Sequence, residues 1–337
     1  MQYFVMPSRD IRENLATEEY LLGQCARSEP LLLLYIQEPC VIIGRNQNAY
    51  EEVNLAYLQQ HNIVLTRRIS GGGAVYDDLG NLSFSYVMPK GASVFGDYQS
   101  VIEPIAAALN DMGVLAEIGG RNDMYIEGKK FSGNAMYTKK GSTYSHGTLM
   151  YDVNLQQLDK ILTVSPEKIK SKASQSVRKQ VTNIKPYLAE KYQKLSTEEF
   201  RDELICRLFQ VADLKEIETK RLSLTLADKV AINELVKAKY AANDWIFGET
   251  PIFDMQCRQR FPATGIIDCR LKVAQGRIET IKFYGDFFGI LPVKELEQQL
   301  VGEWFLEESF DVLFDEKEIA NYFYQLTKEN WLALFFN

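Results

Sequence analysis

The residues best suited to chemistry begin with a glycine triplet that follows two arginines. Arg67 and Arg68 end a β-branched run, and Gly71, Gly72 and Gly73 come shortly after them. Glycine has no Cβ atom, so this backbone can take positive φ angles and approach a ligand closely. Successive N–H groups can then hold an anion, and an arginine fork matches a phosphate or a carboxylate. A tight turn beside two solvated arginines explains the same residues, so the loop alone leaves the choice open.

The spacing excludes two common phosphate-binding loops. No Gly-Lys-Ser/Thr follows the triplet, so it is not a Walker A loop. The glycines also lack the spacing of a dinucleotide fingerprint, and a strand rather than a helix is predicted to come next.

A second group of candidates surrounds Lys130, which opens a predicted strand containing the small pair Ser132 and Gly133. If the lysine points inward, the glycine leaves room for a ligand beside it. A lysine next to two anions neutralises both, which is what joining a carboxylate to an α-phosphate requires. A surface lysine at a strand edge is the competing interpretation.

Two further polar segments have open interpretations. Asn122 and Asp123 are able to hold Mg²⁺ through oxygen or to form a turn. His146, in the segment Ser-His-Gly-Thr, is a candidate general base or a hydrogen-bonded structural histidine.

Counting and composition exclude several classes of protein. The chain has two histidines and five scattered cysteines without a CxxC pair, which argues against a His-rich metal site, a disulfide framework and a zinc site. Its 337 residues are 46% hydrophobic and 25% charged, as in ordinary globular proteins. The net charge of −7 argues against general nucleic-acid binding. No apolar run approaches the about 18 to 20 residues of a membrane span, and the N-terminus lacks the apolar stretch of a signal peptide. We therefore expect a cytoplasmic protein with no membrane partner.

Hydrophobic periodicity places the candidates on helices and strands. Apolar residues at helical spacing predict a helix over 98–112. Ser196 with Glu199, and Thr225 with Asp228, have capping-box spacing before two more helices. The other predicted elements are a helix over 14–25, a short helix capped by Asn54, a strand over 81–88 with one buried face, and strands over 31–36, 40–44, 63–67, 114–118, 123–127, 130–137 and 147–153.

Two segments in the later part of the chain differ from their surroundings in charge or in periodicity. Residues 168–185 carry six lysines and arginines and no acid, which predicts a mobile loop with local positive charge. The stretch 241–251 contains Gly and Pro and breaks the helical period, so we place a domain boundary there. Residues 251–337 predict a few strands and then a helix–strand–helix tail.

Taken together, four segments in this order and spacing resemble lipoate–protein ligases: RRISGGGAVYDDLGNLSFS, GRND, KKFSGNA and SHGTLM. IIGRNQN, VTNIKP and YGDFFG resemble the same family, so the similarity covers nearly the whole chain. Each segment alone is weakly specific, and their combination is highly specific.

The resemblance implies a fold and an activity. The expected fold class is α/β (α+β), with a catalytic domain over 1–245 like that of biotin ligases, in which helices flank a mixed, mostly antiparallel sheet. A small α+β accessory domain would occupy 251–337. The family makes lipoyl-AMP from lipoate and ATP, and then transfers the lipoyl group to a lysine. Its acceptors are apo lipoyl domains of 2-oxoacid dehydrogenase complexes and the glycine-cleavage H protein.

The resemblance also assigns roles to residues. Lys130 matches the catalytic lysine that contacts the lipoyl carbonyl and the phosphate, and Arg68 matches the arginine that meets the nucleotide and the acyl group. Asn122 and Asp123 match the Mg²⁺ side. The remaining ATP-binding positions are Gly73, Ala74, Val75 and Tyr76, and the remaining lipoate-binding positions are Ser70, Gly71, Gly72, His146 and Gly147.

Two departures from the family pattern stand out. Asp77-Asp78 replaces the usual His-Asp, which we expect to put a carboxylate close to the nucleotide site and to weaken ATP affinity. Gln180 stands where the family more often has a second arginine.

Two rival classes remain. An ATP-independent lipoyl or octanoyl transferase of the same superfamily needs a cysteine thioester, but residues 81–148 contain no cysteine. A degenerate protein that only binds lipoyl-AMP is kept open by Asp77. Lipoate versus octanoate preference is left open by the sequence.

Overall fold

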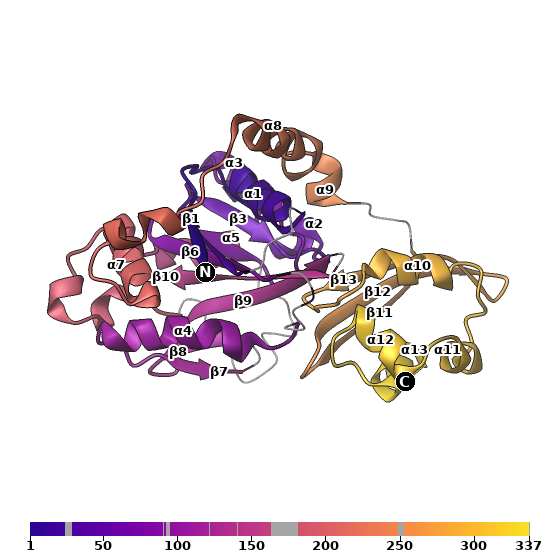
Figure 1. Ribbon diagram of the computed structural model, residues 1–337. Helices are drawn as coiled ribbons and strands as arrows, with labels where there is room; N and C mark the ends of the chain where they lie inside the picture. The colour runs from indigo at the N-terminus through magenta and orange to yellow at the C-terminus, as the bar shows by residue number, and fades with distance from the viewer. Residues whose placement is uncertain are drawn as a thin grey trace.

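The computed structural model describes residues 1–23, 29–89, 91, 95–120, 122–139, 141–162, 181–248 and 253–336. Cys25, Gln180 and most of the basic segment 168–185 lie outside the described residues. Two bodies are visible in Figure 1, a larger one built from about the first three quarters of the chain and a smaller C-terminal one.

A seven-stranded sheet forms the centre of the larger body. Its strand order is β1-β2-β6-β10-β9-β8-β7, and only β1 and β2 run parallel. The prediction of a mixed, mostly antiparallel sheet is therefore confirmed. The bounds are β1 Gln2–Val5, β2 Leu31–Tyr35, β6 Asn81–Val87, β7 Glu117–Gly119, β8 Asp123–Ile126, β9 Lys129–Lys139 and β10 Ser142–Met150.

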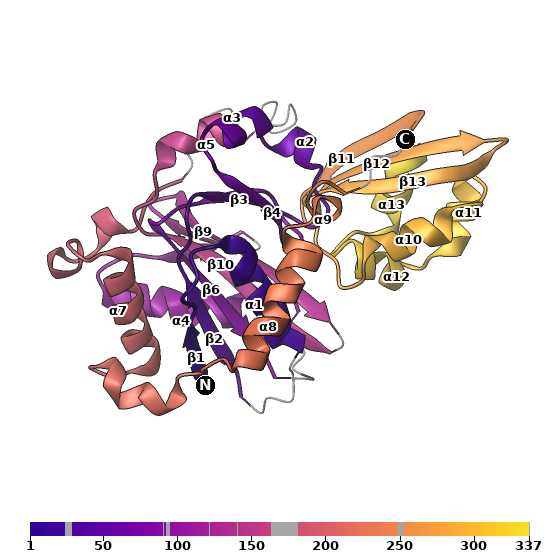
Figure 2. The same ribbon diagram turned by 90° about the horizontal axis from the view of Figure 1, so that it is seen from above.

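Helices cover both faces of this sheet (Figures 1 and 2). The helices α4 (Tyr98–Asp111) and α7 (Thr197–Phe209) pack on one face, because each presents an apolar stripe to the main core. On the opposite face lies α1 (Ile11–Gly23), and α8 (Leu226–Leu235) packs outside it. The predicted caps at Asn54, Ser196 and Thr225 all form.

The prediction that the strand over 81–88 buries one face is wrong. All seven residues of β6 are buried, including its polar side chains on the α1 side. Alternation was misleading because those side chains, Asn81, Ser83 and Ser85, border a polar interior instead of bulk water.

A small second sheet stands over the α1 side of the large one. Its order is β4-β3-β5, with bounds Val64–Arg67, Cys40–Ile43 and Val75–Asp77. The glycine loop, residues 68–74, connects the two outer strands β4 and β5. Short helices pack beside this sheet: α2 (Ala49–Glu52), α3 (Leu55–Gln60) and α5 (Leu158–Ile161).

The C-terminal body is an antiparallel meander covered by helices. Its strands are β11 (Met255–Phe261), β12 (Gly265–Ala274) and β13 (Arg277–Gly285). The predicted helix–strand–helix tail is wrong, because residues 293–336 form four helices on one side of the sheet (Figure 2). Their bounds are α10 Val293–Leu300, α11 Glu307–Leu313, α12 Glu316–Tyr322 and α13 Lys328–Phe336. Only an isolated bridge from Arg277 to Trp304 marks the extended link between α10 and α11.

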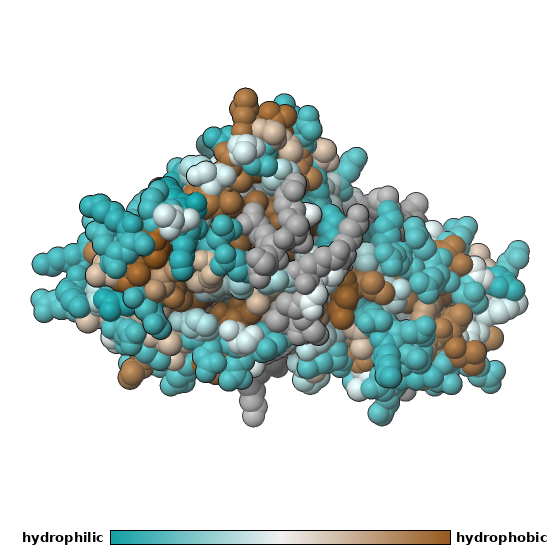
Figure 3. All heavy atoms as spheres, in the orientation of Figure 1, coloured by the Kyte–Doolittle hydropathy of each residue, from teal (hydrophilic) through white to brown (hydrophobic). Residues whose placement is uncertain are grey.

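The remaining elements are short. They are η1 (Leu155–Gln157), η3 (Lys185–Tyr187), η4 (Glu190–Tyr192), η5 (Leu214–Lys220), the π-helical turn η6 (Val236–Tyr240) and α9 (Asn243–Phe247). Within the described part of the chain, no helix is both long and apolar enough to cross a bilayer. The face in Figure 3 is mainly hydrophilic, with scattered apolar spots. Leu226 and Val230 on α8 are among the exposed apolar side chains of the described residues.

The aromatic core of the C-terminal domain gives the first prediction. Trp331 is fully buried, with Phe310 and Phe335 rings 5.7 and 4.9 Å from its own. Trp331→Ala should destabilise this domain by about 3–5 kcal/mol, because the cavity is too large to collapse. Urea unfolding followed by proteolysis should show residues after 253 cleaved first. Trp304→Ala is the control, since Trp304 is 44% exposed and should cost at most about 1 kcal/mol; equal effects of the two changes would contradict this prediction.

Candidate active site

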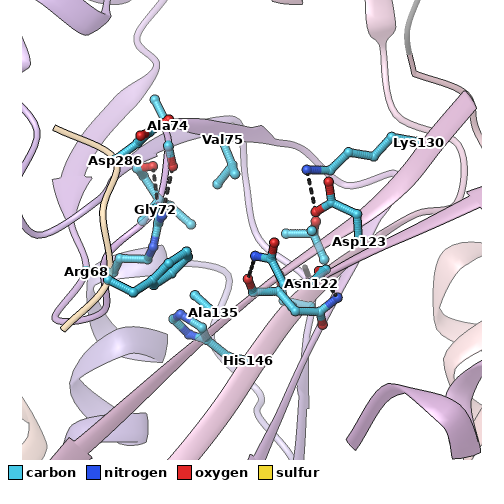
Figure 4. Close-up of a pocket in the computed structure, with 18 of the residues that line it drawn as sticks. Arg68, Gly72, Ala74, Val75, Asn122, Asp123, Lys130, Ala135, His146 and Asp286 are labelled. Carbon is cyan, nitrogen blue, oxygen red and sulfur yellow. Dashed lines mark hydrogen bonds and ion pairs between the residues drawn. The ribbon is translucent and has the colours of Figure 1, made fainter. Parts of the chain in front are cut away.

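A cavity of about 430 Å³ lies between the two sheets of the larger body (Figure 4). Such a volume is typical of sites for small molecules. The large sheet provides one wall, and the glycine loop with β3 and β5 provides the other. Residues of the C-terminal domain complete the lining: Arg260, Pro262, Gly265, Asp286 and Phe288.

One row of residues crosses the large sheet beneath the cavity. Tyr35 pairs with Ser83, and Ser83 pairs with Thr148. Gly133 on the next strand continues this row, since its neighbour Asn134 pairs with Gly147. The cavity therefore spans the three inter-strand steps from β9 to β2, or about 14 Å.

Lys130 and Asp123 stand at the β9 end of the row. The Nζ atom of Lys130 lies 2.8 Å from a carboxylate oxygen of Asp123, and the lysine side chain is 39% exposed. A Cβ atom at Gly133 would lie 3.0 Å from that Nζ, so the absence of a side chain lets the lysine fold back over the strand. The inward orientation considered for Lys130 is the one observed (Figure 4).

Arg68 supports the glycine loop from below. Its guanidinium is buried and donates to the carbonyls of Ile42, Gly71 and Gly73 and to the Ser70 hydroxyl. Burial lowers the pKa of Arg68 to about 10, so it stays charged at neutral pH. Its edge lines the cavity opposite Lys130, but its donors are engaged by the loop (Figure 4).

Close packing explains why this loop contains glycines. Gly72 has a φ of +96°, a conformation that other residues rarely adopt. A Cβ on Gly71 would lie 2.3 Å from the carbonyl oxygen of Phe287, and one on Gly72 would meet the ring of Phe288. The glycines therefore let the C-terminal domain pack directly on the loop.

Arg67 does not join the cavity. Its buried guanidinium donates to the carbonyls of Gly44, Gln47 and Ile246, among others. The proposed arginine fork for an anion is wrong at this position, and so is the alternative of two solvated arginines. Arginine pairs look alike in sequence whether backbone carbonyls or a ligand receive their N–H groups.

His146 is held at both ring nitrogens. Its Nε2 lies 2.7 Å from the Ser70 hydroxyl, and its Nδ1 lies 3.0 Å from a carboxylate oxygen of Glu18. Tyr35 donates to the other oxygen of Glu18. The order Ser-His-Glu resembles a nucleophilic triad, but Ser70 is fully buried under the loop and does not line the cavity. The arrangement supports a hydrogen-bonded structural histidine rather than a free general base.

Asp77 lines the cavity at the end opposite Lys130. It accepts a hydrogen bond of 2.7 Å from the Gln37 amide, which also donates to Ser83. The expectation that this carboxylate lies close to the nucleotide stays a prediction. Gln37 links Asp77 to Ser83 on β6, whereas Lys130 is on β9. Burial and the nearby Asp78 raise the pKa of Asp77 to about 7.

Most of the predicted site residues come together. Those lining the cavity are Arg68, Gly72, Gly73, Ala74, Val75, Asn122, Asp123, Lys130, His146 and Gly147. Ser70 and Gly71 lie beneath the loop and hold it. The Tyr76 side chain lies on the other face of β5, in the core beside Val41, and does not line the cavity.

Sequence reasoning missed several members of the site. Glu18 lies among apolar residues of α1 and has no local sequence signal. Tyr35, Ile42 and Ser83 looked like ordinary strand residues, because their role depends on sheet pairing. Asp286 lies within the segment YGDFFG, which carried the resemblance, so a signal for it was present.

An elongated cavity over an antiparallel sheet, with a cation at its exposed end and a glycine loop beside it, defines a ligase-type site for a long acid. Residues 10–209 match the family model "Lipoyl protein ligase A/B catalytic domain", and residues 250–335 match "Bacterial lipoate protein ligase C-terminus". The chain belongs to the lipoate–protein ligase family.

Individual relatives agree with this family membership. The chain is 39% identical to lipoate-protein ligase LplJ of Bacillus subtilis over 97% of both chains. A solved lipoate-protein ligase A bound with ATP is 26% identical, with a TM-score of 0.60 over 74% of this chain and 99% of that one. A bi-partite lipoate protein ligase of Thermoplasma acidophilum, studied with its E2 lipoyl domain, is 28% identical, with a TM-score of 0.63 over 75% of this chain and 98% of that one.

The buried carboxyl of Asp77 gives a pH-dependent prediction. The folded protein keeps this proton up to about pH 7, whereas the unfolded chain loses it near pH 4. The folded state therefore loses stability as pH rises through this window, on the order of 1 kcal/mol per pH unit. Relative to wild type, Asp77→Asn should gain free energy of unfolding between about pH 4.5 and 7 and then level off.

Urea titrations from pH 4.5 to 8.5 measure this difference. Asp159→Asn, at an exposed position, is the matched control and should show no such trend. A stability difference for Asp77→Asn that stays constant over the whole range would refute the shifted pKa.

Proposed function

We propose that this lipoate–protein ligase works in two half-reactions in the cavity described above. A carboxylate oxygen of lipoate attacks the α-phosphorus of ATP, and the bond to the β-phosphate breaks to release pyrophosphate. The ε-amine of an acceptor lysine then attacks the acyl carbon of lipoyl-AMP, the carbon–oxygen bond to AMP breaks, and the amine loses a proton. The observation that carries the proposal is the position of Lys130 over Gly133 at the exposed end of a channel long enough to hold the acid.

The geometry gives the acid an orientation. An extended eight-carbon chain spans about 9 Å, which is shorter than the about 14 Å from β9 to β2. With its carboxylate at Lys130, the chain crosses Thr148 and ends near Ser83, two inter-strand steps away. Lys130 exchanges Asp123 for the substrate carboxylate and the α-phosphate, and it neutralises charge that builds up between them.

The glycine loop has a positioning role in this proposal. Gly73 and Ala74 face the nucleotide in this proposal, and Arg68 fixes the loop by donating to the carbonyls of Gly71 and Gly73. Gly147 leaves space in the sheet wall, since a Cβ there would lie 2.1 Å from Asn134 Oδ1. Ser70 and His146 hold each other beneath the acyl chain.

Asn122 and Asp123 fit a shared Mg²⁺ ion. One carboxylate and one amide suit an ion that takes most of its ligands from phosphates and water. The described residues contain no group of three or more His, Cys, Asp or Glu that could hold a metal, so a resident metal site is not built here. When bound with ATP, Mg²⁺ would neutralise phosphate charge.

A lipoyl domain is the acceptor class we propose. The Thermoplasma relative was studied with an E2 lipoyl domain, and the same class, in 2-oxoacid dehydrogenase complexes or the glycine-cleavage H protein, suits this chain. We place the catalytic domain at 1–245 and the accessory domain at 251–337, and we propose that the enzyme acts in the cytoplasm.

The cysteine-dependent transferase is disfavoured by the site. Among the described residues that line the cavity there is no cysteine. Cys40 lies nearby in β3, but burial and Asp77 raise the pKa of its thiol well above the usual range.

A coupled assay tests the whole proposal. Incubation with lipoate, Mg²⁺-ATP and an apo lipoyl domain should release pyrophosphate and add one lipoyl mass to the acceptor. The control omits ATP, and acceptor modification should then stop. Modification that continues without ATP would identify the transferase class; no pyrophosphate, with transfer only from supplied lipoyl-AMP, would identify a protein that binds the adenylate.

Lys130→Ala tests the catalytic cation. Pyrophosphate release should fall about 10²- to 10³-fold, because the variant loses the cation that we place at the carboxylate–phosphate junction. Lys129→Ala, the exposed neighbour, should stay within about twofold of wild type. If the two variants have equal rates, Lys130 has no catalytic role.

A further inference from the structure

The far end of the cavity carries polar groups beside the apolar side chains of Leu15 and Ile42, although an alkyl chain would favour apolar surroundings alone. Asp77 lines it beside Ser83, and both are tied to Gln37. The Oε1 atom of Gln37 is buried and has no hydrogen-bond partner among the described residues. A carboxyl and a hydroxyl thus line the place where the last atoms of an extended acid would lie, and Gln37 behind them holds both.

From this arrangement we infer that Asp77 is a specificity-determining residue: it selects against acids that end in a plain alkyl chain and favours acids whose far end carries polarisable sulfur. The inference rests on the proposed function and names the substrate class for the same cavity. Octanoate and lipoate share an eight-carbon chain, but only lipoate carries a disulfide ring at its far end. Sulfur is polarisable and so responds to a nearby charge or dipole, whereas a methyl end excludes water from the carboxyl group and gives no such interaction in return.

Ionisation of Asp77 sets how strong this selection is. An ionised carboxylate is much costlier to cover with an alkyl chain than a neutral carboxyl. Because the pKa is raised to about 7, the charged form gains population as pH rises from 6 to 8.5. Discrimination against octanoate should therefore increase over this range.

Among the acids in this part of the described structure, Asp77 lines the cavity where the acyl chain would end, whereas Glu18 and Asp78 do not. Arg68 and Ser83 favour its charged form, and Asp78 opposes it. Glu18 and His146 are paired with each other beyond Tyr35. The titratable or charged groups around it are Tyr35, Cys40, Arg68, Tyr76 and Asp78.

The test compares lipoate with octanoate as substrates for pyrophosphate release. The wild-type ratio of kcat/KM, lipoate over octanoate, should rise several-fold from pH 6 to 8.5, mainly through the KM for octanoate. In Asp77→Asn, which keeps the shape but cannot ionise, the ratio should not depend on pH. In Asp77→Leu the ratio should fall about tenfold at pH 8. Asp159→Asn should behave as wild type.

The outcomes distinguish failure of the role inferred for Asp77 from failure of the proposed ligase function. Suppose that wild type uses lipoate with ATP, but that the lipoate-to-octanoate ratio of kcat/KM is the same in wild type, Asp77→Asn and Asp77→Leu at every pH. The inference is then overturned and the ligase function stands. If wild type releases no pyrophosphate with either acid, the proposed function fails and the inference fails with it. Should Asp77→Leu not fold, the pH profile of the isosteric Asp77→Asn still decides.

Discussion

The buried guanidinium of Arg68 is the interaction on which the site depends. A chain of glycines has many conformations, and ordering it costs more entropy than ordering other residues. Arg68 offsets that cost by donating to two carbonyls of the loop, to Ser70 and to Ile42. Because Ser70 also meets His146, the same contact ties the loop to the large sheet.

The fixed loop in turn lets other parts of the chain approach. Backbone of the C-terminal domain lies against Gly71 and the ring of Phe288 lies against Gly72, where a Cβ atom would be too close. The cavity is consequently closed on one side by residues such as Asp286 and Phe288, more than 200 positions away in sequence from the loop. The glycine triplet thus serves packing between domains as well as approach to a ligand.

Local chemistry was predictable from sequence where it depends on neighbouring residues. Helix caps, the long amphipathic α4 and the strand that begins near Lys130 follow from short-range patterns, and the resemblance located the glycine loop. The direction in which each side chain points was harder to predict. Arg67 and Arg68 are adjacent and both buried, yet only Arg68 lines the cavity, because successive side chains of a strand leave on opposite faces.

Tertiary pairing determined what the sequence could not. The place of Asp77 depends on β5 pairing with β3 and on Gln37 reaching across to β6, and neither contact has a local signature. The tail of the C-terminal domain was misread for a similar reason. Phe310 and Phe314 are one helical turn apart and pack into a shared aromatic core, which favours helices over a strand.

The two ends of the cavity differ in solvent exposure, and this difference assigns bond formation to one end and selection of the acid to the other. Lys130 at one end is 39% exposed, whereas Asp77 at the other is 2% exposed. In the proposed reaction, an acceptor as large as a protein domain can bring its lysine only to the exposed end, so bond formation belongs there. At the buried end water is excluded, so a mismatch between a polar side chain and the end of the bound acid costs binding free energy there. We therefore assign selection of the acid to this end. In this proposal, the length of the channel therefore separates the residue that selects the acid from the place where the acceptor amine attacks the acyl group.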